Sequence, residues 1–381
     1  MAAFWLAAAP LAHAADWIVS GNDGKYQRVQ GRDTYLANPP ADTLTVLDAS
    51  VFPPKVVRSV EVENAVQGPP QAVAISPDGK LALVSAPTRY DQANKQLLMD
   101  TFLQVVDLSG ADAAVSKIEL GSHPQAVAFS PNGKLGVVAC VDGSVRVLNI
   151  EGRTVKLAGS INLSSKRLSG ASFTHDGQHV LVSLRDEQGV AVLNVQGEQI
   201  VDSGDRLSAG VAPYTIDVSS DGHWAVVSNV GLAGLPGYKG RILADADTVS
   251  LIDVSKAPFK TVQHITVPSV PESVAISPNG QWIAVQGIDG SNMTPDNPGY
   301  HARGKVVLFQ IDKGVARKVS EAPAGAASQG LVFTQDSQHL IAQFNVERQL
   351  AFYDIKHGKL VDTGKRLPLS GGPSSIRSTP R

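Results

Sequence analysis

The sequence predicts an all-β fold assembled from one repeated unit of four strands. Six segments combine an alternating apolar strand with a turn rich in Asp, Asn and Gly, and their turn positions are 44 to 58 residues apart. Asp or Asn followed by Gly allows positive φ in a tight hairpin, so each turn would join two antiparallel strands. Repeats of about 40 to 50 residues are typical of β-propeller blades. The six segments are residues 71–79, 125–133, 169–177, 214–222, 272–280 and 329–337.

A seventh blade is predicted from the two ends of the chain. Residues 373–378 resemble a first strand, and residues 17–20, 43–48 and 56–62 resemble the second, third and fourth strands of the same blade. Pairing the two ends would close the ring and leave no unpaired edge at the seam. We therefore expect one domain over residues 15–381, an all-β seven-bladed β-propeller with four antiparallel strands per blade.

The N-terminal segment has the composition of an export signal. Residues 1–14 are mostly apolar and end in Ala12-His13-Ala14, which has the A-x-A form cleaved by signal peptidase. We expect residues 1–14 to be the remnant of a signal peptide, and hence a periplasmic or secreted protein. The alternative is a frayed apolar terminus. The single cysteine, Cys140, allows no intrachain disulfide, and its apolar surroundings predict a buried thiol.

The charge balance narrows the class of partner. The formal net charge is −2, from 33 basic and 35 acidic residues, without a block of like charge. This balance argues against nucleic acid as the main partner. No apolar run after the N-terminus reaches the length of a membrane span. Because a closed ring needs no partner to cover its sheet edges, we expect a monomer.

The repeats resemble a known family. The run PQAVAISPDGKLALVSA at residues 70–86, and DTVSLIDVS at residues 247–255, resemble the repeats of YVTN-family propellers. The resemblance covers nearly the whole chain after residue 15. It implies the fold and a wide choice of functions, since relatives include surface and periplasmic binding proteins, lactonases, a muconate-cyclising enzyme and electron-transfer subunits. Fold alone does not choose among these functions.

Four loops between second and third strands are longer than the repeat requires. They cover residues 22–42, 86–101, 230–247 and 288–304. The topology places all four on one face of the ring, and we expect two walls that face each other across the channel mouth. Loops that depart from a repeat are candidates for function.

These loops, with two strand starts, supply the ligand-binding candidates. Tyr offers rigid amphipathic contact, and Arg offers forked donors for carboxylate or phosphate. We therefore expect a small polar or anionic ligand, or a periplasmic protein, to bind there. The alternative is that the loops are merely solvated and pack on each other. The candidates are Arg28, Arg32, Arg89, Tyr90, Tyr214, Tyr238, Arg241, Tyr300, His301, Arg303 and Gln329.

Two titratable residues are predicted at the channel mouth. His123 precedes Pro124, and Glu272 follows Pro271, each at the start of a first strand. A histidine and a carboxylate on either side of a substrate would serve as acid and base. The alternative is that these Pro-containing dipeptides only turn the chain into the channel.

The sequence predicts no metal or cofactor. Residues 245–247 and 289–297 contain oxygen ligands that suit calcium, but their spacing differs from that of known calcium loops, which leaves calcium as an alternative. The sequence also lacks a G-x-S-x-G elbow, a P-loop and a C-x-x-C-H haem site.

Two functions of different classes remain, a binding protein and a lactonase-like hydrolase or lactonising enzyme. We favour binding, which needs no catalytic set. A lactonase requires an activated water and an oxyanion stabiliser, for which His123 or Glu272 and an arginine are candidates. The resemblance to phosphogluconolactonases is incomplete. Their P-R-H-type strand start and N-E-L-type segment correspond here to RLSGA at residues 167–171 and SNVGL at residues 228–232.

Overall fold

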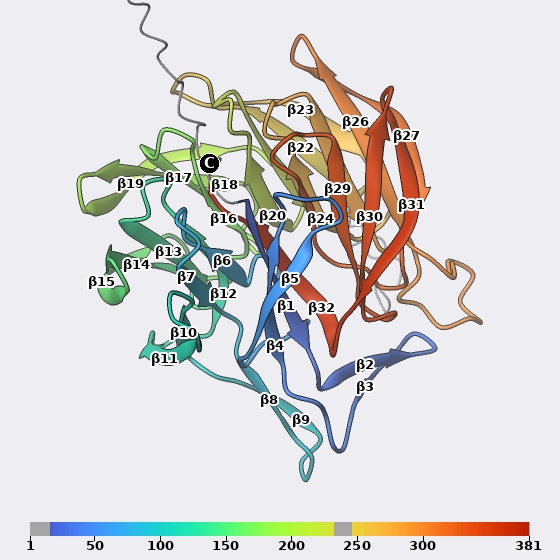
Figure 1. The fold of residues 1–381 in the computed structure, drawn as a ribbon. Helices are drawn as coiled ribbons and strands as arrows, with labels where there is room; N and C mark the ends of the chain where they lie inside the picture. The colour runs from blue at the N-terminus through green and yellow to red at the C-terminus, as the bar shows by residue number, and fades with distance from the viewer. Residues whose placement is uncertain (1–15, 232–245, 381) are drawn as a thin grey trace, which may run out of the picture.

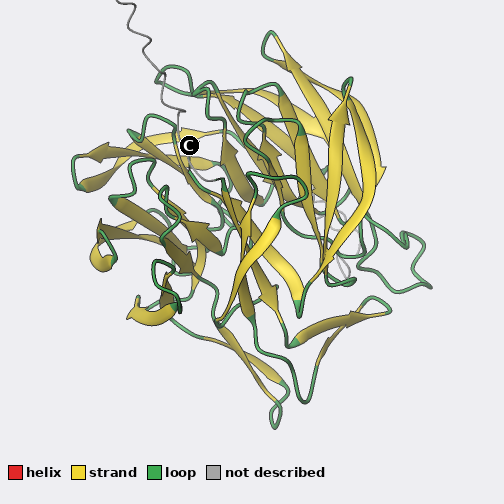
Figure 2. Ribbon diagram, viewed as in Figure 1, coloured by secondary structure: helices red, strands yellow, loops and turns green. Residues whose placement is uncertain are grey.

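The chain forms a closed ring of seven β-sheets. The computed structural model describes residues 16–231 and 246–380, and this part of the chain contains strands and loops but no helix (Figure 2). Seven four-stranded antiparallel sheets stand around a central channel, with the first strand of each sheet innermost (Figure 1). The predicted all-β, seven-bladed propeller is therefore confirmed. The predicted signal peptide remnant, residues 1–14, lies outside the described residues.

Each of the six sequence repeats forms one blade. Blade 1 consists of β6 (Val73–Ile75), β7 (Leu81–Val84), β10 (Phe102–Asp107) and β11 (Ala114–Glu119). Blade 2 consists of β12 (Pro124–Phe129), β13 (Leu135–Cys140), β14 (Ser144–Glu151) and β15 (Thr154–Asn162). Blade 3 consists of β16 (Ala171–Phe173), β17 (His179–Ser183), β18 (Val190–Gln196) and β19 (Gln199–Leu207). Blade 4 consists of β20 (Pro213–Val218), β21 (Trp224–Asn229), β22 (Thr248–Asp253) and β23 (Lys260–Thr266). Blade 5 consists of β24 (Pro271–Ile276), β25 (Trp282–Gly287), β26 (Lys305–Asp312) and β27 (Val315–Pro323). Blade 6 consists of β28 (Leu331–Phe333), β29 (His339–Phe344), β30 (Gln349–Lys356) and β31 (Lys359–Pro368).

The two ends of the chain share blade 7, as the sequence predicted. Its strand order is β32 (Gly372–Ser378), β1 (Trp17–Asp23), β4 (Thr43–Asp48) and β5 (Lys55–Glu61). β1 and β32 are antiparallel neighbours, with Val19 opposite Arg377. The chain termini thereby close the ring through backbone hydrogen bonds, and β1 has a hydrogen-bonded neighbour on both sides.

The hydrophobic core lies between neighbouring blades. Val137 of blade 2 and Leu193 of blade 3 belong to one fully buried cluster, and Val19 of blade 7 and Val73 of blade 1 belong to another. Cys140 is buried in the cluster between blades 1 and 2, and this burial raises the pKa of its thiol to about 12. The thiol is therefore protonated at neutral pH, which fits the predicted structural role.

The turns after the first strands share one hydrogen-bond pattern. In blade 5, Ser277 Oγ donates to Asn279 Oδ1 over 2.7 Å and accepts the backbone N–H of Trp282 over 2.9 Å. Gly280 ends the turn with φ of +67°. Blade 1 repeats the pattern with Ser76 and Asp78. We call the face that carries these turns the turn face, and the opposite face, with the loops between second and third strands, the loop face.

Candidate functional site

Two hairpins project from the loop face at the boundary between blades 7 and 1 (Figure 1). The first comprises β2 (Tyr26–Val29) and β3 (Arg32–Tyr35), and the second comprises β8 (Thr88–Asp91) and β9 (Gln96–Met99). The rings of Tyr35 and Tyr90 stack with 4.0 Å between their centroids. The two insertions therefore form one continuous wall, as the order of the blades predicted.

The β2–β3 hairpin also crosses the channel mouth to the insertion of blade 5. Arg28 Nη1 donates to the carbonyl oxygen of Asn292 over 3.0 Å. Gly31 lies so close to Met293 that a Cβ at this position would stand 2.2 Å from the Met293 carbonyl oxygen. The sequence predicted two walls facing each other, but here they touch. The reason is that residues 26–35 form a regular hairpin, which extends far enough to roof the mouth.

A buried charge cluster anchors the base of this hairpin. Lys25 Nζ lies 2.7 Å from Asp42 and 3.3 Å from Asp23, and it also donates to the Asn64 carbonyl oxygen. Asp23 in turn accepts the backbone N–H groups of Lys25 and Tyr26. Because buried ion pairs with satisfied hydrogen bonds have one well-defined geometry, this cluster fixes where Tyr26 and Arg28 stand.

Beneath the hairpin is a cavity of about 340 Å³. Its walls combine apolar side chains with polar groups from blades 5, 6 and 7. The polar lining residues are Tyr26, Arg28, Asp33, Glu272, Asn292, Gln329 and Asn345. A concave site with a few convergent polar groups is typical of small-molecule binding.

Glu272 is the titratable group at the start of β24 in this cavity. Its Oε2 is buried and has no hydrogen-bond partner among the described residues. Burial raises the pKa of the Glu272 carboxyl to about 7, and the guanidinium groups of Arg185 and Arg28 offset only part of this rise. A carboxyl pKa close to neutral pH is favourable for a general acid or base.

Arg28 is held rigidly beside Glu272. Its Nη2 lies 2.6 Å from Asp33 Oδ1, and its Nε donates to the Tyr26 hydroxyl over 2.8 Å. The Tyr26 hydroxyl donates in turn to Asp33 over 2.8 Å. With the bond to Asn292, three of the five N–H donors of the guanidinium are engaged, so two remain for another acceptor.

A second cationic group stands on the blade 3 side of Glu272. Tyr214 is buried at the start of β20, and the Arg185 guanidinium carbon lies 4.9 Å from the centroid of its ring. Burial raises the pKa of the Tyr214 phenol, which therefore stays protonated at neutral pH. The same phenol interacts electrostatically with Glu272, Arg185 and Arg167. The charge of the Glu272 carboxyl is thus influenced by one arginine from the roof, Arg28, and by one from blade 3, Arg185.

Arg185 and Arg167 were not among the predicted site residues. The predicted residues come from the four long loops and the strand starts, whereas Arg185 lies in the short loop between β17 and β18, and Arg167 precedes β16. The topology alone places both segments on the loop face. An arginine in a short loop beside a strand start was the signal that would have found them.

Of the predicted site residues, the structure brings four together. Arg28, Glu272 and Gln329 line the cavity, and Tyr214 is linked to Glu272 by charge. His123 does not line this cavity, because its Nδ1 lies 2.8 Å from the carbonyl oxygen of Asp100 in blade 1. Burial lowers the pKa of the His123 imidazole. The suggested pairing of His123 with Glu272 across one substrate has no support from this placement.

The remaining predicted residues lie elsewhere. Arg89 forms a forked ion pair with Asp100, and the His301 ring is held against Asp289. Tyr90 stacks in the hairpin wall, and Tyr300 is half-buried in the blade 5 insertion. Arg32 and Arg303 are exposed. The positive charge of Arg303 interacts electrostatically with the Tyr353 hydroxyl and the Asp362 carboxyl of blade 6. Tyr238 and Arg241 lie outside the described residues.

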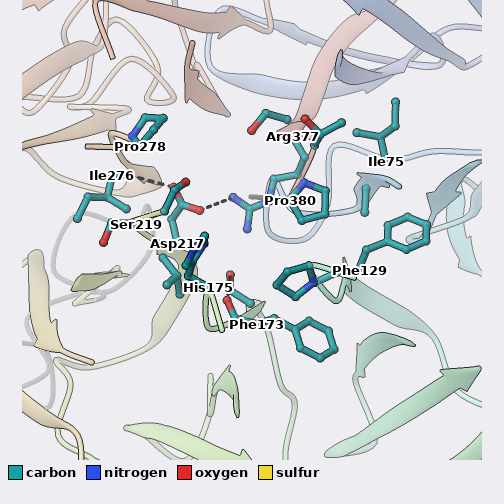
Figure 3. A pocket seen from close by; sticks show the side chains of 18 of the residues that line it. Ile75, Phe129, Phe173, His175, Asp217, Ser219, Ile276, Pro278, Arg377 and Pro380 are labelled. Atoms are coloured by element: carbon teal, nitrogen blue, oxygen red, sulfur yellow. Dashed lines mark hydrogen bonds and ion pairs between the residues drawn. The ribbon is translucent and has the colours of Figure 1, made fainter. Parts of the chain in front are cut away.

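The channel is bridged below this cavity by polar side chains. Gln71 of blade 1 reaches blade 4, where its amide donates to the Ile216 carbonyl oxygen over 2.8 Å and accepts the Ile216 N–H over 2.9 Å. Nearer the turn face, Arg377 of blade 7 pairs with Asp217 of blade 4 over 3.2 Å (Figure 3). These contacts separate the cavity from a pocket of about 110 Å³ at the turn face. A ligand would therefore reach Glu272 from the loop face.

The described residues 16–231 and 246–380 include no group of three or more His, Cys, Asp or Glu arranged to hold a metal ion. No helix in this part of the chain is long and apolar enough to cross a membrane.

Comparisons with known proteins agree with this architecture. The family described as WD domain, G-beta repeat, matches residues 115–149, which is about one repeat. No curated protein matches the sequence. A solved structure of a proposed 6-phosphogluconolactonase from Bacteroides uniformis is similar with a TM-score of 0.70 and 14% identity, over 96% of this chain and 100% of that one.

Two further solved structures are similar over almost the whole chain. A proposed 6-phosphogluconolactonase from Bacteroides fragilis gives a TM-score of 0.70 at 14% identity, covering 97% of this chain and 100% of that one. A periplasmic gluconolactonase from Pseudomonas aeruginosa gives 0.66 at 16% identity, covering 96% and 99%. At these identities the likeness establishes the fold alone. The chain is a seven-bladed β-propeller whose structural neighbours include proteins described as gluconolactonases.

Proposed function

We propose that this protein hydrolyses a lactone in the cavity beneath the β2–β3 hairpin, with Glu272 as the general base. The observation that carries the proposal is the Glu272 carboxyl, which has a buried oxygen without a hydrogen-bond partner, a pKa of about 7, and cations on two sides. The gluconolactonase names among the structural neighbours support the same reaction class. The reaction is assigned from the site, since fold alone does not determine it.

The site residues account for each proton and bond of the reaction. The Glu272 carboxylate takes a proton from water while the water oxygen bonds to the lactone carbonyl carbon. Negative charge then develops on the carbonyl oxygen, where the two free donors of Arg28 stabilise it. When the ring C–O bond breaks, the Glu272 carboxylic acid returns its proton to the leaving oxygen. The product is the open hydroxy acid.

The positions of Asp33 and Tyr26 explain how Arg28 would serve this step. Their hydrogen bonds hold the guanidinium before a substrate arrives, so no reorganisation is needed when charge develops. Gln329 and Asn345, which line the same cavity, would accept or donate hydrogen bonds to hydroxyl groups of the substrate.

The second candidate is a binding protein that retains a small polar ligand without turnover. The observation that favours it is the wall formed by Tyr35 and Tyr90, because stacked tyrosines provide rigid contact area outside the catalytic cavity. For either function we propose export of the protein to the periplasm or beyond, on the basis of the A-x-A sequence that ends at Ala14.

The proposal is tested by a pH-stat assay against a panel of lactones, with and without a chelator. We expect Glu272→Gln to lower turnover about 10²- to 10⁴-fold, the usual contribution of a general base. In the unaltered protein, kcat/KM should rise as the pH increases through about 7, because the base acts in its ionised form.

The matched control is Glu321→Gln, which removes a carboxylate from the exposed outer strand β27 and should leave turnover unchanged. Full activity of Glu272→Gln would show that another group activates the water. Absence of turnover on every lactone would reject the hydrolase and leave the binding protein as the assignment. Loss of turnover with the chelator would require a metal that the described residues do not suggest.

A further inference from the structure

The Asn292 side chain is a polar group of the loop-face cavity that the proposed reaction leaves unused. Asn292 lines the cavity beneath the β2–β3 hairpin, yet only 6% of the residue is exposed. Its Oδ1 is buried and has no hydrogen-bond partner among the described residues. Because a buried amide oxygen without a partner is unfavourable, a molecule that enters the cavity and donates a hydrogen bond would be held there.

The turn that carries Asn292 is tied down on both sides. Ser291 Oγ accepts the backbone N–H of Ala327 over 2.9 Å, which joins the insertion of blade 5 to blade 6. The Met293 N–H donates to the Gly290 carbonyl oxygen over 3.0 Å. The Asn292 side chain therefore starts from a fixed point of the backbone.

Arg28 joins Asn292 to the reacting carboxyl. Its Nη1 donates to the Asn292 carbonyl oxygen over 3.0 Å, and its positive charge interacts electrostatically with the Glu272 carboxyl. Glu272 Oε2 lines the same cavity and is likewise buried without a partner. The cavity thus presents two unpartnered acceptor oxygens beside the guanidinium that would stabilise the developing oxyanion.

Two acceptors of this kind suit an attacking water molecule. Such a water has two hydrogens, of which only one goes to the general base. If the second hydrogen has no acceptor, the water turns freely about its bond to the base. If a second acceptor holds it, the lone pair stays aimed at the carbonyl carbon, and holding the reactants in this way lowers the barrier.

We propose that Asn292 orients the attacking water, with its Oδ1 accepting one hydrogen while the Glu272 carboxylate removes the other. The hydrogen held by Asn292 stays on the water oxygen and becomes the hydroxyl hydrogen of the new carboxylic acid. This inference rests on the proposed function for the reaction. Gln329 Oε1 is also unpartnered in this cavity, but Gln329 is more exposed than Asn292 and has one more rotatable bond to fix.

The first test compares water with methanol as the nucleophile. Methanol has one O–H group for Glu272 and a methyl group in place of the second hydrogen, so it needs no second acceptor. Asn292→Leu replaces the amide with an apolar group of similar size. On the lactone that the unaltered protein opens fastest, this variant should lower kcat for hydrolysis about 10- to 100-fold with KM nearly unchanged. The ratio of methyl ester to hydroxy acid formed in aqueous methanol should rise by a similar factor, measured by mass spectrometry against a protein-free control.

Two further variants separate the orientation of water from damage to the loop. Asn297→Leu alters the same insertion outside the cavity, where Asn297 Oδ1 accepts the Gly299 N–H over 2.8 Å, and should keep both kcat and the product ratio. Asn292→Asp keeps an acceptor oxygen and should recover part of the kcat lost in Asn292→Leu. Equal losses in the two leucine variants, or a lower kcat with an unchanged ratio, would overturn the inference. A ratio that rises in Gln329→Leu but not in Asn292→Leu would also overturn it.

The second test locates the water without turnover. A crystal structure of the unaltered protein at high resolution should show an ordered water within hydrogen-bond distance of both Glu272 Oε2 and Asn292 Oδ1, and Asn292→Leu should lose it. Absence of this water from the unaltered protein would overturn the inference, whatever the kinetics give. If the water is present but no lactone is opened, the hydrolase is rejected, and the role of Asn292 with it. If lactones are opened and the product ratio does not respond to Asn292→Leu, the hydrolase stands and only the inference fails.

Discussion

The two ends of the central channel use their polar groups differently, although the same strands build both. Strand β20 presents Tyr214 toward the loop face and Asp217 toward the turn face. At the turn face, Asp217 pairs with Arg377 and accepts the Ile276 N–H. At the loop face, Glu272 Oε2 and Arg185 Nε are buried without hydrogen-bond partners. The turn face satisfies its own charges, which favours stability, and the loop face keeps donors and acceptors for a ligand.

Removing a charge at the turn face should have the largest effect on stability. We expect Asp217→Ala to lower the free energy of unfolding by about 2–3 kcal/mol, because it leaves the partly buried Arg377 without its acid and the Ile276 N–H without its acceptor. Urea denaturation followed by tryptophan fluorescence measures this change.

The control for this variant is Asp362→Ala, which breaks an ion pair with Arg366 that is more exposed. Exposed ion pairs contribute about 0–1 kcal/mol to the free energy of unfolding, so Asp362→Ala should destabilise the protein less than Asp217→Ala does. Equal losses for the two variants would mean that the bridge across the channel has no special part in holding blades 4 and 7 together.

Removing the titratable carboxyl group of Glu272 at the loop face should raise the free energy of unfolding instead of lowering it. The folded-state pKa of Glu272 is raised from about 4.5 in model compounds to about 7, so the contribution of this group to stability is full below pH 4.5 and is lost as the pH rises through 7. We expect Glu272→Gln to be more stable than the unaltered protein at pH 8, by about 1–2 kcal/mol after allowance for solvent screening. At pH 4.5 the difference should vanish.

The measurement is urea denaturation of both proteins at several pH values between 4.5 and 8. Asp247, whose pKa burial also raises to about 7, contributes equally to both proteins and cancels in the difference. A difference independent of pH would show that Glu272 is not ionised at an energetic cost in the folded protein, and would remove the basis for treating it as a poised base.

The same contrast explains what the sequence predicted well. The turns at the turn face are local, since Ser277, Asn279 and Gly280 interact within six residues, and such signals repeat visibly along the chain. Six blades and the position of Glu272 at a strand start follow from that repeat, and the shared seventh blade follows from the strands that remain at the two ends of the chain.

The loop face was harder to predict because its contacts join residues far apart in the sequence. Arg28 meets Asn292 only after the ring has closed, which is why the hairpin was expected as a wall and not as a roof. Arg185 lies in a loop of ordinary length, so no departure from the repeat marked it. Its distinguishing feature, a buried Nε without a partner, is visible only in three dimensions.

The smallest expected effect concerns a single turn. Ser277→Ala removes the hydroxyl that donates to Asn279 and accepts the Trp282 N–H, and should lower the free energy of unfolding by about 1 kcal/mol. Because the turn face is separated from Glu272 by the bridges at Gln71 and Asp217, kcat/KM should not change. Urea denaturation and the lactone assay on the same preparation test both statements. A clear loss of kcat/KM in a variant that remains folded would mean that the two ends of the channel are coupled through β24, and that the division between a stabilising face and a binding face does not hold.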